Sequence, residues 1–191
     1  MLKKTKSIIS VLFTLLKFTI IKIARFNEFE FRAIERFSPG TMVNIWRGGK
    51  LVLGEKVRAH TGTKLSVTPN GCLAIGDNTK FNYNCIVVAR ECIEIGKGVE
   101  FGPNVLIYDH DHDFRVEGGL KAGLFKTAPV IIGDNSWIGA GTIILRGSQI
   151  GKNCVIGAGC VVSDSIPDNT VLIQERFNKT KQLSSKIRND N

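Results

Sequence analysis

The sequence is poor in proline and aromatic residues and has no long uncharged apolar run. Its 191 residues include 5 prolines and 8% aromatics beside 20 glycines, a mixture that suits many turns and excludes collagen and low-complexity chains. Charged residues interrupt the apolar stretch 8–26, so no run of about 18 uncharged residues could span a bilayer. No small-residue cleavage site follows that stretch, which argues against secretion. We therefore expect one globular domain.

Cysteines are few, odd in number and widely spaced. No pair has the close spacing of a zinc knuckle or a redox motif. We interpret them as buried small hydrophobic residues in a reducing compartment. The five are Cys72, Cys85, Cys92, Cys154 and Cys160.

The formal net charge of +9 indicates an anionic partner. A nucleotide cofactor, a membrane surface and nucleic acid would all satisfy that charge. The basic residues are not interleaved with aromatics on a recognisable module, so we expect no nucleic-acid binding.

The amino-terminal segment has the pattern of a basic amphipathic helix. At about 100° per residue, apolar residues cover most of the helix and the polar residues fall on one side. Those polar residues are Ser7, Ser10, Thr14, Lys17, Lys22 and Arg25. The helix could lie in a membrane interface, dock on the protein body or on a neighbouring subunit, or be an uncleaved signal-like segment. We expect residues 27–36 to continue as charged helix and Ser38-Pro39-Gly40 to mark a change of period.

An aliphatic residue recurs every six residues in the carboxy-terminal half. The positions are Ile132, Ile138, Ile144, Ile150, Ile156 and Val162. Glycine usually follows, and a small or thiol side chain closes most units, as at Ser136, Thr142, Ser148, Cys154 and Cys160. A period of six fits neither an amphipathic helix nor simple strand alternation.

This period predicts a parallel β-helix, in which three short strands and three corners make a coil of about 18 residues. Each aliphatic side chain then points inward, and the adjacent glycine allows a tight corner. The repeat is looser upstream, at Ile75, Phe81, Val87, Ile95 and Phe101, with a two-residue insertion after Val87. The alternative is a β-sandwich with many turns. A β-helix has open ends, so the amino-terminal helix and the tail are candidate caps.

The segments Val130-Ile-Ile-Gly-Asp-Asn-Ser-Trp137-Ile-Gly-Ala-Gly and Ile150-Gly-Lys-Asn-Cys-Val-Ile156-Gly-Ala-Gly resemble the hexapeptide-repeat acyltransferases. The resemblance covers residues from about 50 to 171 and is greatest to galactoside, maltose and surface-polysaccharide O-acetyltransferases. It implies a left-handed β-helix, a homotrimer with active sites between subunits, and acetyl-CoA as cosubstrate. Fold membership alone does not fix chemistry, so the site needs separate argument.

The repeat is interrupted between Ile107 and Ile132 by a segment with two of the three histidines, His110 and His112. Acetyl transfer to a hydroxyl needs a base that titrates near neutral pH, as imidazole does. The resemblance makes His110 the catalytic base, with His112 as the second candidate. In extended backbone the two share a face while Asp109 points the other way, so Asp109 is not certain to orient the base.

Other interpretations of this segment are a solvated polar loop or an adventitious metal site. A γ-class carbonic anhydrase needs three histidine ligands to zinc, and only His60 could complete the set. The arrangement of ligands in that family differs from the Asp-His-Asp-His spacing here, so we expect no metal.

The resemblance also assigns binding roles. Asn84 would hold the acceptor hydroxyl, with Tyr108 and Asp109 beside it; Asn82 and an interior asparagine ladder are the alternatives. The coenzyme would lie along Gly139, Ala140, Ala158 and Ser163, largely on main-chain groups, with Trp137 at the thioester end or simply packed. Arg176, Lys179 and Lys181 could bind its phosphates or form a solvated tail.

We thus expect an all-β chain in three parts: a helical segment 1–37, a β-helix 38–171 with a loop 108–129, and a basic tail 172–191. The expected activity is O-acetylation of a sugar hydroxyl in cell-surface polysaccharide, in the cytoplasm or at the inner face of the membrane. N-acetylation of an amino sugar, acetylation of a xenobiotic, and a non-catalytic scaffold are the alternatives.

Overall fold

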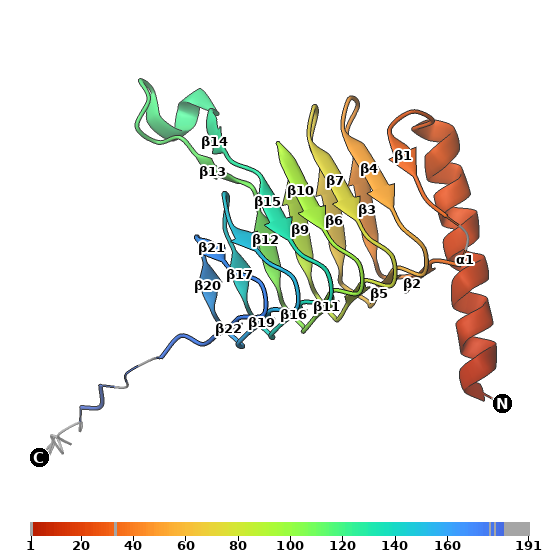
Figure 1. The fold of residues 1–191 in the computed structure, drawn as a ribbon. Coiled ribbons are helices and arrows are strands. Elements are labelled where there is room, and N and C mark those ends of the chain that lie inside the picture. The colour runs from red at the N-terminus through yellow and green to blue at the C-terminus, as the bar shows by residue number, and fades with distance from the viewer. Residues whose placement is uncertain (1, 33, 176, 178, 182–191) are drawn as a thin grey trace, which may run out of the picture.

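The computed structural model describes residues 2–32, 34–175, 177 and 179–181, with only the backbone described for residues 2–8. One helix, α1 (Leu2–Ala24), precedes a solenoid of short strands that run in three parallel sheets (Figure 1). The predicted parallel β-helix is confirmed.

Each of the three sheets forms one side of the solenoid, and consecutive strands of a sheet come from consecutive coils. Sheet A contains β1 (Phe29–Glu30), β4 (Lys50–Leu53), β7 (Cys72–Ile75), β10 (Cys92–Ile95), β15 (Val130–Ile132), β18 (Gln149–Ile150) and β21 (Ser165–Ile166). Sheet B contains β2 (Arg36–Phe37), β5 (Arg58–Ala59), β8 (Lys80–Phe81), β11 (Glu100–Phe101), β16 (Trp137–Ile138), β19 (Val155–Ile156) and β22 (Val171–Leu172). Sheet C contains β3 (Met42–Ile45), β6 (Lys64–Val67), β9 (Ile86–Ala89), β12 (Leu106–Tyr108), β17 (Ile143–Ile144) and β20 (Val161–Val162).

The core is a column of side chains that point inward from the three sheets. The six repeat positions from Ile132 to Val162 are all buried. Phe81 stacks on Phe101 one coil away, with ring centroids 4.7 Å apart. The predicted small fillers are buried as well, and Ser136 donates its hydroxyl to the Gly151 carbonyl (2.9 Å). Burial of a hydroxyl is tolerated because it is hydrogen-bonded.

The solenoid begins earlier than expected. The prediction that residues 27–36 continue the helix is wrong, since β1 and β2 pair in parallel with β4 and β5. Phe29 and Phe37 supply the reason, because both are buried against Phe18 of α1, at ring distances of 5.2 Å and 4.8 Å. The local pattern of charges favours helix, but burial of these aromatic rings decides the structure.

Both ends of the solenoid carry covering groups. The helix α1 lies across the amino-terminal end, where it contacts β1 and β2 (Figure 1). At the other end, the Gln174 side chain accepts the N–H of Val161 (2.8 Å) and donates to its carbonyl (2.7 Å). An amide side chain thus takes the place of the next strand at an open edge.

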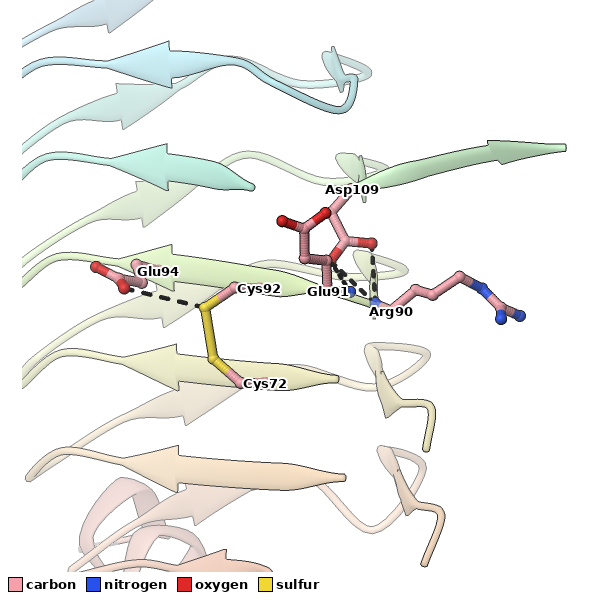
Figure 2. The surroundings of a disulfide bond; sticks show 6 residues. All are labelled: Cys72, Arg90, Glu91, Cys92, Glu94 and Asp109. Carbon is pink, nitrogen blue, oxygen red and sulfur yellow. Dashed lines mark hydrogen bonds between the residues drawn. A yellow bond between two sulfur atoms is a disulfide. The ribbon is translucent and has the colours of Figure 1, made fainter. Parts of the chain in front are cut away.

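The interpretation of the cysteines is correct for three and wrong for two. Cys85, Cys154 and Cys160 are buried free thiols. Cys72 and Cys92 form a disulfide between β7 and β10 (Figure 2). The parallel register places them directly opposite each other, with Cα atoms 4.5 Å apart. The argument for a reducing compartment assumed unpaired thiols and loses that support.

Candidate active site

The interruption of the repeat folds into a β-hairpin that projects from the solenoid. The strands β13 (His110–His112) and β14 (Phe125–Thr127) are antiparallel and pair His110 with Thr127. The connection between them contains a short 3-10 helix, η1 (Gly119–Ala122). Figure 1 shows this hairpin standing away from β12 and β15, so part of the segment expected to be loop is regular structure.

Asp109 lies between β12 and the hairpin and is fully buried. Both of its carboxylate oxygens accept the N–H of Arg90 (2.9 Å each), and Oδ2 also accepts the N–H of Glu91 (2.8 Å) (Figure 2). Arg90 and Glu91 are the two residues between β9 and β10. Backbone N–H groups thus compensate the carboxylate for its loss of water.

The same carboxylate contacts the first candidate base. Nδ1 of His110 lies 2.9 Å from Oδ1 of Asp109. A carboxylate only accepts hydrogen bonds, so Nδ1 carries the proton and Nε2 is left with a free lone pair. Asp109 can reach the ring because it lies in the break between β12 and β13, and side chains do not alternate across that break. The His110 side chain is 14% exposed, so the oriented imidazole remains accessible.

An aromatic ring supports both histidines from the second strand of the hairpin. The Phe125 ring lies 5.5 Å from the His110 ring and 4.4 Å from the His112 ring, between centroids. The prediction that the two histidines share a face is confirmed. The guanidinium of Arg90 lies 3.5 Å from the Phe125 centroid, within the range of a cation–π interaction.

His110 and His112 differ in their surroundings. The Tyr108 ring lies 6.0 Å from the His110 ring, in an edge-on arrangement. His112 is exposed, and its neighbour Asp111 pairs with Arg146 (2.6 Å) instead of with an imidazole. The geometry therefore favours His110 as the oriented base.

Among the residues that the structure describes, no group of three or more His, Cys, Asp and Glu could hold a metal ion. His60 stacks on Tyr83 at a centroid distance of 4.7 Å. Tyr83 precedes β9, whereas the hairpin follows β12. The His60–Tyr83 pair and the two histidines of the hairpin therefore lie at opposite edges of sheet C.

We use two names for these edges: sheet C has an entry edge, where its strands begin, and an exit edge, where they end. Asn84 lies at the entry edge, in a turn before β9, with φ of 59°. It is exposed, so it belongs to no interior ladder. Its Oδ1 is 2.0 Å from where a Cβ on Gly62 would be, so the amide packs closely on that glycine. Asn82 accepts the N–H of Tyr83 (2.9 Å).

Three of the predicted coenzyme residues share the entry edge with Asn84. The N–H of Gly159 donates to the carbonyl of Ala140 (2.7 Å), which links this turn to the one that contains Ala158. Gly139 is buried, and a Cβ there would lie 2.5 Å from the nitrogen of Ala158. The two turns therefore stack with their main chains in contact, as a groove lined by main-chain groups requires.

The other predicted residues lie elsewhere. Ser163 follows β20 and so lies at the exit edge with Asp109 and His110, two strands further along the sheet. Trp137 is 57% exposed on the outside of sheet B. Lys179 and Lys181 are exposed, whereas Arg176 lies outside the described residues.

One chain therefore does not bring all the predicted site residues together. The candidate base lies at the exit edge and Asn84 at the entry edge, separated by a strand of three or four residues at about 3.3 Å each. Sequence reasoning also missed Arg90 and Phe125. The available signal for Arg90 was its position in the two-residue insertion that interrupts the repeat.

Comparison with known proteins agrees with the fold. Residues 129–164 match the family model described as bacterial transferase hexapeptide (six repeats). The chain is 45% identical over 94 residues to a galactoside O-acetyltransferase of Lactococcus lactis, across 47% of this chain and 43% of that protein. It is 29% identical over 132 residues to the putative lipopolysaccharide biosynthesis O-acetyl transferase WbbJ of Escherichia coli, across 65% of this chain and 67% of that protein.

A solved structure has the same architecture. AntD, an N-acyltransferase from Bacillus cereus solved with dTDP and 3-hydroxybutyryl-CoA, aligns with a TM-score of 0.61 and 22% identity. The alignment covers 78% of this chain and 80% of that chain. Residues 129–164 thus match a hexapeptide-repeat model, and the chain has a β-helix fold. Its relatives include sugar O-acetyltransferases, and it spans about half the length or less of three curated relatives that it matches at 44–47% identity.

Proposed function

We propose that this protein is an acetyl-CoA-dependent O-acetyltransferase that acts on a sugar hydroxyl in cell-surface polysaccharide or its precursor. The observation that carries this proposal is the contact of Nδ1 of His110 with the fully buried Asp109 carboxylate, which leaves Nε2 as the proton acceptor. The relatives named for galactoside and lipopolysaccharide O-acetylation support the choice of acceptor.

In this reaction Nε2 of His110 accepts the proton of the acceptor hydroxyl while that oxygen bonds to the thioester carbonyl carbon. The carbon–sulfur bond breaks, the acetyl group passes to the sugar oxygen, and the sulfur leaves and takes a proton. Asp109 keeps the imidazole in the reactive tautomer and stabilises its protonated form.

A backbone N–H beside the Gly139–Ala140 turn would stabilise the negative charge on the carbonyl oxygen. The N–H of Gly139 already donates to the Ile156 carbonyl (2.8 Å). We therefore assign this role to the N–H of Ala140, at the entry edge of sheet C. Tyr108 would border the acceptor, and Trp137, Ala158 and Ser163 the coenzyme, with Lys179 available to its phosphates.

We infer that the working unit is a homotrimer, as the resemblance to the hexapeptide-repeat acyltransferases implies. The two edges of sheet C carry different parts of the site, which supports a site made by more than one chain. His110 of one subunit and Asn84 of its neighbour would meet where the exit edge of one solenoid packs against the entry edge of the next. The division into a helical segment 1–37, a β-helix 38–171 and a basic tail 172–191 belongs to the same proposal, except that β1 and β2 move the start of the β-helix back to Phe29. Among the described residues, no helix is long and apolar enough to cross a bilayer. We propose that the protein acts in the cytoplasm, against the inner face of the membrane.

The test is release of free thiol from acetyl-CoA in the presence of a panel of sugars and oligosaccharides. We expect the product to be an ester that hydroxylamine cleaves. His110→Ala should lower the turnover at least about 100-fold, since a general base contributes roughly that much or more. His112→Ala is the matched control and should retain most of the turnover. If the two effects were reversed, His112 would be the base; an absence of thiol release with every acceptor would reject the proposed activity.

A further inference from the structure

The helix α1 docks on the solenoid with its polar residues inward. Thr14 is 1% exposed, and its hydroxyl accepts the N–H of Phe37 (2.9 Å). The ammonium of Lys17 donates to the carbonyl of Thr41 (2.6 Å). Lys22 donates in the same way to the carbonyls of Phe26 and Phe29. These lysines satisfy backbone groups of the body, which is the reverse of an ordinary surface helix.

The outward face of α1 is consequently apolar. From residue 9 to the end of the helix, no exposed position carries a charge. The large apolar side chains exposed there are Ile9, Leu12, Phe13, Leu15, Leu16, Ile20 and Ile23, of which Ile23 is 76% exposed. In Figure 1 α1 is the outermost element at the amino-terminal end of the solenoid, with no described element beyond it. A contiguous apolar surface of this kind marks an interaction site.

The surface continues onto the first coil. Trp46, at the end of β3, is 49% exposed and lines a groove with Ile20 and Ala24 of the helix. Tryptophan is enriched at the boundary between the headgroups and the acyl chains of a bilayer. The groove places Trp46 beside the apolar face, with Arg25 and Asn44 also in its lining.

The charges around this face distinguish between a bilayer and another copy of the chain. No Asp or Glu precedes Glu28, whereas Lys3, Lys4 and Lys6 begin the helix and Arg47 follows Trp46. The whole chain carries +9. A second copy placed face to face would set two acid-free basic helices against each other, which costs free energy through like-charge repulsion. An anionic lipid surface complements both the apolar face and the charge.

We infer that the outward face of α1 inserts into the headgroup–acyl boundary of an anionic bilayer, with the helix parallel to the membrane. The 23 residues of α1 would lie along roughly 35 Å of surface. Because α1 crosses the end of the solenoid, the coils then stack away from the membrane. Three strand spacings separate β3 from β12, so His110 lies about 14 Å beyond the first coil.

The binding itself does not depend on the proposed function, but its consequence for the acceptor does. If His110 is the base, the acetylated sugar must reach well above the headgroups. The chemistry that fits is a lipid-linked or surface saccharide in which several residues precede the acetylated one.

The experiment is sedimentation of the full chain with phosphatidylcholine vesicles, with and without one quarter phosphatidylglycerol. We expect binding to the anionic vesicles that weakens as salt is added. The double substitution Leu16→Glu/Ile20→Glu, on the exposed face, should lower the bound fraction at least about tenfold. Val171→Glu, at a 63% exposed position on the last strand, is the matched control and should bind as the wild type does. Circular dichroism checks that each variant is folded.

Three outcomes would overturn the inference: no sedimentation of the wild type, equal binding of the double variant, or equal loss in the control. Light scattering adds a further check on the oligomeric state. If the wild type does not bind vesicles and the double substitution changes the oligomeric state, the face is a contact between copies of the chain. Thiol release with a water-soluble acceptor should survive the double substitution. Loss of vesicle binding and failure of the catalytic proposal therefore give different results.

Discussion

The imidazole of His110 and the carboxylate of Asp109 lie 2.9 Å apart, and backbone N–H groups from another coil hold that carboxylate. Arg90 and Glu91 supply those N–H groups from the end of β9. The orientation of the ring is thus fixed by the stacking of two coils and not by the hairpin alone. Such support keeps a catalytic group in place before substrate arrives.

Asp109→Asn should lower kcat by about 100-fold or more while the KM for acetyl-CoA changes little. An amide keeps the size of the carboxylate, but one of its two polar groups is a donor that cannot accept the N–H of Arg90 or Glu91. The imidazole then loses its fixed tautomer. Steady-state kinetics measures the two constants separately, and a thermal melt reports any loss of stability.

A purely structural role for Asp109 predicts a different pattern. The melting temperature would then fall while the protein that remained folded kept a normal kcat. Asp111→Asn is the control, because Asp111 pairs with Arg146 on the outside of the hairpin and should affect kcat little.

The interior of the solenoid could be predicted from the sequence because each repeat position is decided by burial alone. Ile132 and Ile138 point inward because the burial of apolar side chains is favourable. A repeat of six residues is compatible with few structures other than a β-helix. The disulfide could not be predicted in this way. Cys72 and Cys92 are 20 residues apart, and only a coil lengthened by Arg90 and Glu91 places them opposite each other.

The orientation of α1 was not predictable from its pattern. A periodic pattern separates two faces but does not say which face finds a partner. Thr14 and Lys17 turn inward because the first coil has backbone groups with no neighbouring strand to bond, and α1 supplies their hydrogen bonds. The sequence left the contact of Asp109 with His110 open, because the alternation of side chains does not hold across the break between β12 and β13.

Asn84→Gly tests whether the Asn84 amide holds the acceptor. Glycine adopts the left-handed conformation of this turn without strain, so the substitution removes the side chain and keeps the backbone. We expect the KM for the acceptor to rise about tenfold, as for a lost hydrogen bond in a site. Asn104→Gly is matched to it, since Asn104 has φ of 60° one coil further on and has no assigned contact with the acceptor. Equal effects of the two substitutions would mean that Asn84 has only a structural role in its turn.

A mixture of two impaired variants, assayed with the acceptor well below its KM, tests whether the site is shared between subunits. His110→Ala and Asn84→Gly chains, unfolded and refolded together, should form mixed trimers in which some sites join an intact His110 to an intact Asn84. Random assembly gives roughly one such site in four, so activity should recover to about that fraction of the wild type. Refolding each variant separately is the control. A mixture no more active than the separate variants would mean that one chain supplies both residues.

Glu35 should make the stability of the protein fall as the pH rises from about 4.5 to about 8. The side chain is 2% exposed and lines an apolar cavity of about 190 Å3 between α1 and the first coil, with Phe18 and Phe31. Burial raises the pKa of its carboxyl to about 8, despite the nearby N–H groups of Val57 and Lys56. The folded protein therefore keeps a proton that the unfolded chain releases near pH 4.5, so unfolding becomes easier throughout this window.

Glu35→Gln replaces the carboxyl with a neutral group of the same size and removes the titration. The variant should match the wild type near pH 4.5 and exceed its free energy of unfolding at pH 8.5, by at most about 4 kcal/mol. Urea unfolding at several pH values measures the difference, and Glu117→Gln in the exposed connection of the hairpin is the control. A difference between wild type and Glu35→Gln that did not change with pH would show that the carboxyl is already ionised in the folded protein. The docking of α1 would then not depend on its protonation, because a charge at this position would be present at every pH in the window.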